Sequence, residues 1–180
     1  MIFTNDTEQA LASVAALINT ASADGDTMVS VADLDGFVAE QQFSGSRTHD
    51  EAEVRSIRGL RTTLREIWTA SEDEAARLTN LLLADARALP QLVKHDQWDW
   101  HLHATTPEAP LEARMGTEAA MAFVDVIRAK ELERLRVCAA EDCQAVVIDL
   151  SKNRSRRFCD TGNCANRTHV AAYRRRKALA

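Results

Sequence analysis

Four cysteines, all inside one 27-residue window near the C-terminus, constrain the fold of this chain more than any other feature. Cys138 and Cys143 form one close pair, Cys159 and Cys164 form another, and 15 residues lie between the pairs. Tetrahedral zinc needs four thiolates at about 2.3 Å, and two close pairs joined by a short insert can supply them. The spacing therefore predicts one structural Zn²⁺ with a closed ligand shell.

Two other uses of the cysteines stay open from the sequence. Two disulfides would need an oxidising compartment, but residues 1–6 have neither the basic segment nor the long apolar stretch of a secretory signal. A redox pair usually has the C-x-x-C spacing, which is absent. His169, five residues after Cys164, is an alternative zinc ligand. We expect a cytoplasmic protein that does not enter a membrane, since no apolar run approaches ~20 residues.

The residues around the cysteines predict a treble-clef finger. Residues 145–149 form a candidate strand, residues 152–153 a turn, and residues 156–158 lead back, which predicts a hairpin inside the insert. A helix is expected over residues 165–179, with Cys164 in its first turn and Asn163 as its cap.

The rest of the chain predicts a mainly α-helical body with a small antiparallel β-hairpin, an α+β domain. Asp6 and Ser30 are candidate helix starts, and the segments beginning at Thr48 and Ser71 match the capping box. Residues 91–94 and 98–105 are expected to be strands, followed by a loop and by a helix that begins near Gly116. We expect domains at residues 1–133 and 134–180.

Charged residues are distributed unevenly between the body and the C-terminal segment. Residues 150–180 carry nine Lys and Arg and one acid, a net charge of +8. Since the whole chain has 22 basic and 27 acidic residues, residues 1–149 carry −13. An acidic body with a basic tail indicates a polyanionic partner for the tail. The alternative is a basic helix that pairs with the acidic body of its own chain.

The segment at residues 157–167 resembles the CGNR zinc-finger family, in which a treble-clef finger follows an α-rich domain called ABATE. The likeness covers residues 137–177 closely and the first 130 residues loosely, through Asn19-Thr20 and the order of elements. The family's glycine is replaced by Ala165, which suits a helix better. The resemblance implies a bacterial transcription regulator that binds duplex DNA through the finger and senses an unknown small molecule through the body.

Arginines near the zinc and along the last helix are the candidate DNA contacts, because a guanidinium fork suits both phosphate and guanine. Arg167, Val170, Arg174 and Lys177 share one helical stripe. Alternatively, Asn166 and Arg167 bond backbone carbonyls of the cysteine loop and hold the finger together. A homodimer would add a second half-site. The complete candidate set is Arg154, Arg156, Arg157, Arg167, Arg174, Arg175 and Lys177.

A candidate ligand pocket in the body combines aromatic and polar side chains. The alternatives are that the tryptophans belong to the core and that the arginines pair with surface acids. His101 and His103, with Asp99 beside them, form either a second metal site or the solvent face of an edge strand. The candidate pocket residues are Asn19, Arg58, Arg61, Trp68, Trp98 and Trp100.

Catalysis has little support, because the chain lacks a Gly-rich phosphate loop, an H-E-x-x-H motif and a nucleophile elbow. We therefore expect a regulator rather than an enzyme. The alternative is a zinc-stabilised module that binds a protein or RNA without sequence-specific DNA binding.

Overall fold

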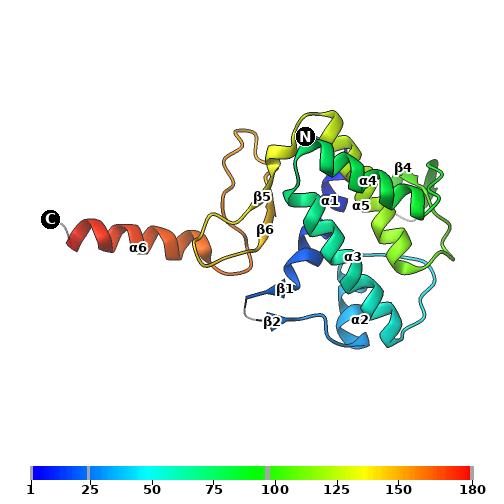
Figure 1. Cartoon of the computed structure of the whole chain (residues 1–180), viewed down its shortest axis with the longest axis horizontal. Helices are drawn as coiled ribbons and strands as arrows, with labels where there is room; N and C mark the ends of the chain where they lie inside the picture. The colour runs from blue at the N-terminus through cyan, green and yellow to red at the C-terminus, as the bar shows by residue number, and fades with distance from the viewer. Residues whose placement is uncertain (1, 24, 96–97, 179–180) are drawn as a thin grey trace.

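A computed structural model describes residues 2–23, 25–95 and 98–178, with the side chains of residues 95, 98 and 99 outside that description. It confirms a mainly α-helical body followed by a zinc-finger region (Figure 1). The body contains α1 (Asn5–Asn19), β1 (Ala21–Ser22), β2 (Gly25–Asp26), α2 (Val31–Glu40), α3 (Glu51–Thr69), α4 (Glu72–Asp85), β3 (Gln91–His95), β4 (Trp98–His103) and α5 (Leu111–Arg128). A 3-10 turn (Leu132–Arg134), β5 (Leu135–Val137), β6 (Val146–Ile148) and α6 (Cys164–Ala178) complete the chain.

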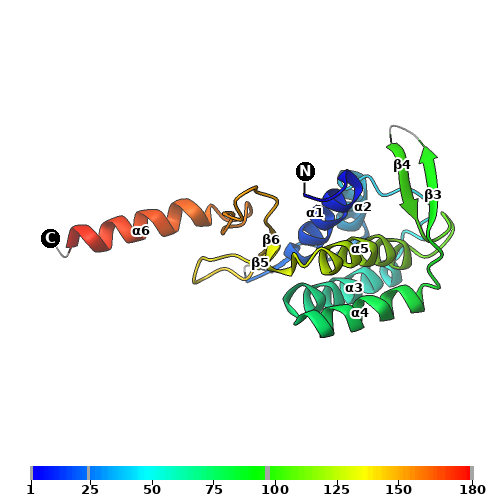
Figure 2. The same ribbon diagram turned by 90° about the horizontal axis from the view of Figure 1, so that it is seen from above.

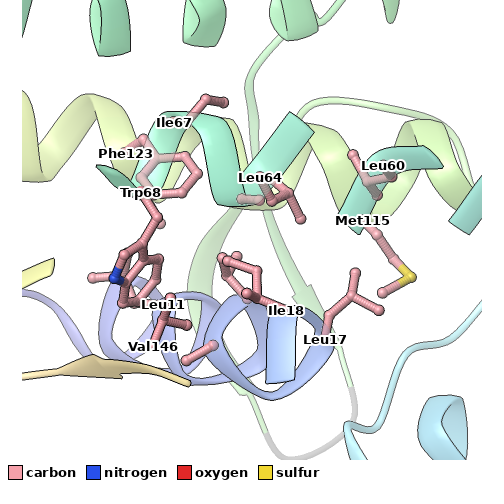
Figure 3. Close-up of a cluster of buried hydrophobic side chains, with 14 of the residues drawn as sticks. Leu11, Leu17, Ile18, Leu60, Leu64, Ile67, Trp68, Met115, Phe123 and Val146 are labelled. Atoms are coloured by element: carbon pink, nitrogen blue, oxygen red, sulfur yellow. The ribbon is translucent and has the colours of Figure 1, made fainter. Parts of the chain in front are cut away.

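Helix α5 is central to the body, where it packs against α1, α3 and α4. The apolar stripes of these helices meet in one core, in which Leu11, Ile18, Leu64 and Phe123 are almost fully buried (Figure 3). Trp68 lies edge-on to Phe123, with the ring centroids 6.3 Å apart. The 3.6-residue periodicity of the sequence therefore marks the faces that are buried.

Three of the predicted helix starts need correction. Helix α1 has Thr4 at its cap position, so Asp6 lies in the first turn and is not the cap. Ser30 and Asp33 form the reciprocal capping box at α2 that the sequence indicates. At α3 the cap is Asp50 instead of Thr48, because the Asp50 side chain accepts a 2.8 Å hydrogen bond from the Glu53 N–H. Ser71 occupies the cap position of α4, but its side chain makes no capping hydrogen bond.

The segment before α5 folds largely as predicted. Strands β3 and β4 pair in antiparallel register, with Leu92 opposite Leu102. Helix α5 begins at Leu111, five residues before the expected start at Gly116. Gly116 lies within the helix, where a Cβ atom would come within 3.2 Å of a Leu60 methyl group. The glycine thus permits close packing of α3 against α5 and does not mark a helix end.

The hairpin that carries the first cysteine pair is different from the predicted one. Strand β6 pairs with β5, which precedes Cys138, and not with residues 156–158. The loop after β6 is organised by Asp149, which is fully buried. Its carboxylate accepts hydrogen bonds from the backbone N–H groups of Ser151 and Arg156, both at 3.0 Å. A side chain therefore takes the place of a strand partner in this loop.

The β5–β6 hairpin packs on the body and contributes Leu135, Val146 and Ile148 to its core. Figure 3 places Val146 beside Leu11 and Trp68. The zinc-finger region is thus joined to the body through shared apolar contacts. The division of the chain at residues 133 and 134 remains a prediction.

Three polar side chains of the body bind the same hairpin. Asn19, the last residue of α1, donates to the Val146 carbonyl at 2.9 Å and accepts from the Val146 N–H at 2.7 Å. Trp68 Nε1 donates to the Arg136 carbonyl at 3.0 Å. Arg65 donates to the carbonyl of Gln144 at 3.0 Å. Helices α1 and α3 therefore hold both edges of the hairpin.

Helix α6 extends away from the body in both views (Figures 1 and 2). None of the helices in the described ranges has an apolar stretch long enough to cross a membrane. Only Cys164 of α6 is buried. The helix is attached to the rest of the protein through its first two turns, where Cys164 is buried and His169 packs on Phe158.

Asn19→Ala should destabilise the protein by roughly 2–4 kcal/mol, because the nearly buried N–H and carbonyl of Val146 both lose their partner. Urea unfolding followed by circular dichroism measures this loss. Asn80→Ala is the matched control, since Asn80 is exposed on α4 and its loss should change stability by less than about 0.5 kcal/mol. Equal stabilities of the two variants would contradict the role of Asn19.

Candidate metal centre and basic surface

The four cysteine thiols form the metal centre that their spacing predicts. Their Sγ atoms all lie within 4.8 Å of one another. The Sγ atom of Cys159 lies 3.7 Å from those of Cys143 and Cys164. Four thiolates at about 2.3 Å from Zn²⁺ would be about 3.8 Å apart, which is the edge of that tetrahedron. The site therefore fits one structural zinc ion with four protein ligands.

The two alternatives to this ligand set are not what the structure shows. All four cysteines are free of disulfide bonds. His169 packs its ring edge-on against Phe158, with centroids 5.9 Å apart, and does not join the thiol cluster. The thiols of Cys138, Cys143, Cys159 and Cys164 thus make the ligand set without a histidine.

Ionisation of these thiols depends strongly on their neighbours. Burial raises the pKa of the Cys143 thiol to about 12. Burial opposes ionisation of Cys159 too, but hydrogen bonds with Thr161, Cys143 and Cys164 lower its pKa to about 6. One thiolate therefore forms readily while a neighbour keeps its proton. A divalent cation removes this conflict, because it stabilises all the thiolates together.

Backbone geometry holds each cysteine pair in place. Cys138 follows β5 and its N–H donates to the Ala145 carbonyl at 2.8 Å, which closes the hairpin around the first pair. Cys143 donates to the Ala140 carbonyl at 3.1 Å, which forms the turn between the two ligands. Before the last ligand, Asn163 adopts a left-handed φ of 50°. That backbone reversal directs Cys164 into the first turn of α6.

Hydrogen bonds to sulfur form a second layer around the ligands. Thr161 Oγ1 donates to Cys159 Sγ at 3.2 Å. Arg167 Nη2 lies 3.3 Å from Cys164 Sγ, and Arg167 Nη1 lies 2.6 Å from a carboxylate oxygen of Asp142. Arg167 therefore links the last ligand to the loop of the first cysteine pair. The sequence suggested a supporting role for Arg167 but with backbone carbonyls as its partners, and it identified neither Thr161 nor Asp142.

Arg136 is a further supporting residue that the sequence reasoning missed. Its guanidinium donates to the carbonyls of Arg156 and Arg154 at 3.1 and 3.0 Å and lies 3.2 Å from the Asp149 carboxylate. The alternation of apolar residues in β5 does not indicate this role, because the two carbonyl partners lie in a loop 18–20 residues further along the chain.

Of the candidate DNA contacts, three arginines have partners within the protein. Arg154 pairs with Glu131 at 2.9 Å and with Glu133. Arg156 pairs with Asp160. Together with Arg167, these side chains stabilise the finger and its junction with the body. Their assignment as DNA contacts remains a prediction.

The remaining candidates are exposed cations, one in the loop beside the zinc and three near the end of α6. Arg157, Arg174, Arg175 and Lys177 are exposed, as is Arg176 beside them. Within residues 2–23, 25–95 and 98–178, none of these five cations makes an ion pair. The alternative of a tail helix paired with the acidic body is therefore not what these residues form. We call Arg157 and the segment 174–177 the basic surface.

The candidate ligand pocket is not assembled as one site. Asn19 and Trp68 bind the β5–β6 hairpin, as described above. Trp100 is 66% exposed on β4, and the side chain of Trp98 lies outside the described part of the structure. Among the described side chains, Asn19 and Trp68 thus serve as contacts to the hairpin, while Trp100 is largely exposed to solvent.

The two arginines of that candidate pocket bind an acid of their own chain. Arg61 is buried and donates to both carboxylate oxygens of Asp26, at 2.8 and 2.7 Å. Arg58 lies 3.1 Å from the same carboxylate. The hydrogen bond from Arg61 is the largest cause that lowers the pKa of Asp26 to about 2. This pairing ties β2 to α3.

His101 and His103 face the same side of β4, with their Nε2 atoms 3.0 Å apart. The side chain of Asp99 lies outside the described part. Within the described residues, the four cysteines are the only group of three or more metal-ligating side chains close enough to hold a metal ion.

Arg167→Ala should weaken zinc affinity by about tenfold, because Cys164 loses a charged hydrogen-bond donor. Competition with a chromogenic chelator measures the affinity. Arg174→Ala removes the same charge from the exposed part of the same helix and should retain zinc as the wild type does. The supporting role would be refuted if both variants released zinc equally easily.

Asp26 should make the stability of the body depend on pH. Because its folded-state pKa is about 2 and its ordinary value is 3.8, the carboxylate stabilises the fold above about pH 4. The contribution is about 2 kcal/mol and should be lost as the pH falls towards 2. Urea midpoints of wild type and Asp26→Asn should therefore converge in acid. Asp85→Asn, at an exposed position of α4, should follow the wild type throughout.

Two family models match the chain in succession. Residues 11–130 match ABATE, described as "Putative stress-induced transcription regulator". Residues 134–177 match the CGNR zinc finger. A search of curated proteins found no match. The second match contains all four cysteines and most of α6, and the first covers the helical core.

Proposed function

The chain belongs to the ABATE family, and from this premise we propose that it is a transcription regulator that binds duplex DNA through its finger. The observation that carries the proposal is the basic surface, whose cations are exposed and form no ion pair within the described residues. Neither family description names an enzymatic activity. A DNA partner is in keeping with the cytoplasmic location that we expect.

Local charge supports a polyanion as the partner. Segment 174–177 has four consecutive cations at the end of a 15-residue helix that contains no acid. Phosphate contacts from such side chains release counterions and supply most non-specific affinity for DNA. The net charge of −13 on residues 1–149 repels DNA, so contact is favoured at the tail alone.

The small number of contacts between α6 and the body also supports DNA as the partner. A 15-residue helix is only marginally stable without tertiary contacts, and α6 is attached to the protein through its first two turns. The major groove of DNA is wide and deep enough to admit one α-helix, so the exposed part of α6 could enter it. DNA contacts would provide the stabilisation that the body does not.

The positions of the cations around α6 suggest which of them would contact DNA. Consecutive helical residues are separated by about 100°, so segment 174–177 surrounds the helix and cannot face one groove. Arg174 and Lys177 lie on one stripe, which we assign to DNA, while Arg175 and Arg176 point to other sides. Arg157, in the loop beside the zinc, would reach the adjacent phosphate backbone. A homodimer would place two such helices on two half-sites.

The test is binding to random-sequence and genomic duplex pools over a range of salt concentrations. Arg174→Gln/Lys177→Gln should lower affinity by about 10- to 100-fold at low salt, because it removes two phosphate contacts. It should reduce the slope of log K against log [salt] by about two. A shared sequence enriched by the wild type would identify a regulator.

The matched control is Arg77→Gln/Lys130→Gln. These exposed cations pair with Glu74 and Glu72 on the body, so the net charge changes equally while the basic surface stays intact. The control should bind DNA like the wild type, and zinc-free Cys159→Ser should not. Failure of the wild type to exceed Cys159→Ser at low salt would reject DNA binding. Preferential competition by RNA would reject the duplex as partner.

A further inference from the structure

A cavity of about 380 Å³ lies in the body, away from the zinc and the basic surface. It is bounded by α1 on one side, by α5 on the other, and by β4 and the segment after α2 at one end. Its volume is within the range of small-molecule sites. Among the six residues that the sequence suggested for a ligand pocket, the five with described side chains (Asn19, Arg58, Arg61, Trp68 and Trp100) lie outside its described lining.

The floor of this cavity is apolar. Leu17 of α1, Leu64 of α3 and Met115 of α5 line it and are almost fully buried in the core. Ala10 and Ala122, on facing helices, leave space between α1 and α5 because their side chains are short. A hydrocarbon or aromatic group can therefore occupy the floor without leaving a buried polar atom unpaired.

The wall of the cavity is acidic. Asp6, Glu118 and Asp125 line it, against one permanent cation, Arg128, which is exposed at the end of α5. The imidazoles of His101 and His103 also line it, with their Nε2 atoms 3.0 Å apart. The described lining thus has three carboxyl groups and one guanidinium group.

Asp125 is held in a fixed position in this wall. Its Oδ2 atom accepts a 2.6 Å hydrogen bond from Thr7, which connects α5 to α1 across the cavity. A carboxylate that is already oriented loses little entropy when it receives a ligand cation. The acidic body as a whole adds a long-range attraction for positive charge.

We propose that this cavity binds a small organic cation, with an apolar group between α1 and α5 and its ammonium beside Glu118 and Asp125. The apolar floor excludes a bare metal ion, and the carboxylates disfavour an organic anion. The inference concerns the body alone and holds whether or not the finger binds DNA.

Helix α1 connects this cavity to the finger. Its residues Asp6 to Leu17 line the cavity, and its last residue, Asn19, holds both polar backbone groups of Val146. A ligand that prefers one position of α1 would therefore also favour one position of the β5–β6 hairpin.

The test uses three aromatic compounds that differ in their head groups: 3-phenylpropylammonium, 3-phenyl-1-propanol and 3-phenylpropanoate. Calorimetry on the zinc-loaded full chain should give the ammonium at least a tenfold tighter affinity than the alcohol and still weaker binding of the carboxylate. Glu118→Gln should weaken the ammonium about tenfold and leave the alcohol unchanged. The unchanged alcohol affinity would show that the cavity remains folded.

Two further variants keep the test specific. Glu66→Gln makes the same charge change at an exposed position of α3 outside the cavity and should bind the ammonium like the wild type. Ala10→Phe fills the space between α1 and α5 and should abolish binding of the ammonium and the alcohol, with a thermal melt to confirm folding. Equal affinities for all three compounds, no binding of the ammonium, or equal losses in Glu118→Gln and Glu66→Gln would overturn the proposal.

Discussion

The zinc-thiolate centre is the interaction on which the C-terminal part of the structure depends. Its local apolar cluster consists of three buried cysteines and Ala140, with Cys143, Ala145 and Phe158 partly buried around them. So few apolar contacts cannot balance the conformational entropy of a long loop and a helix. The metal supplies the missing free energy, as it does in other small zinc modules. The direction of α6 is set by the same ion, because Cys164 is the one buried residue of that helix.

The β5–β6 hairpin connects the metal to the body, because it belongs to both. One end holds the first cysteine pair, and its apolar residues Val146 and Ile148 lie in the body's core. Asn19 and Trp68 bind its backbone where a single sheet of two strands would otherwise leave polar groups unpaired. The finger is thus joined to the body by the hairpin, and Asn19 of α1 binds Val146 in the strand that follows the first cysteine pair.

The sequence predicted what depends on local periodicity and on metal chemistry. The cysteine spacing, the helical stripes and the β3–β4 hairpin are short-range patterns, and the structure confirms each. The partner of β6 was predicted wrongly, because apolar alternation identifies a strand but not the strand that pairs with it. The cap of α3 was misplaced for a similar reason, since Thr48 and Asp50 both fit the motif and tertiary geometry selects Asp50. The cavity could not be predicted, because residues of α1, α5 and β4 become neighbours only after folding.

Helix α6 extends away from the acidic body although the two carry opposite charges. Acids near the junction neutralise nearby arginines: Glu131 and Glu133 bind Arg154, and Asp142 binds Arg167. These local ion pairs compensate the charges of Arg154 and Arg167, which are then less attracted to other acids of the body. Helix α6 has no acid of its own and begins in a direction fixed by the zinc, so its terminal cations end far from the acidic helices (Figure 2). Screening over about 8–10 Å at physiological salt weakens any remaining attraction. An acidic body and an exposed basic helix can therefore coexist in one chain without neutralising each other.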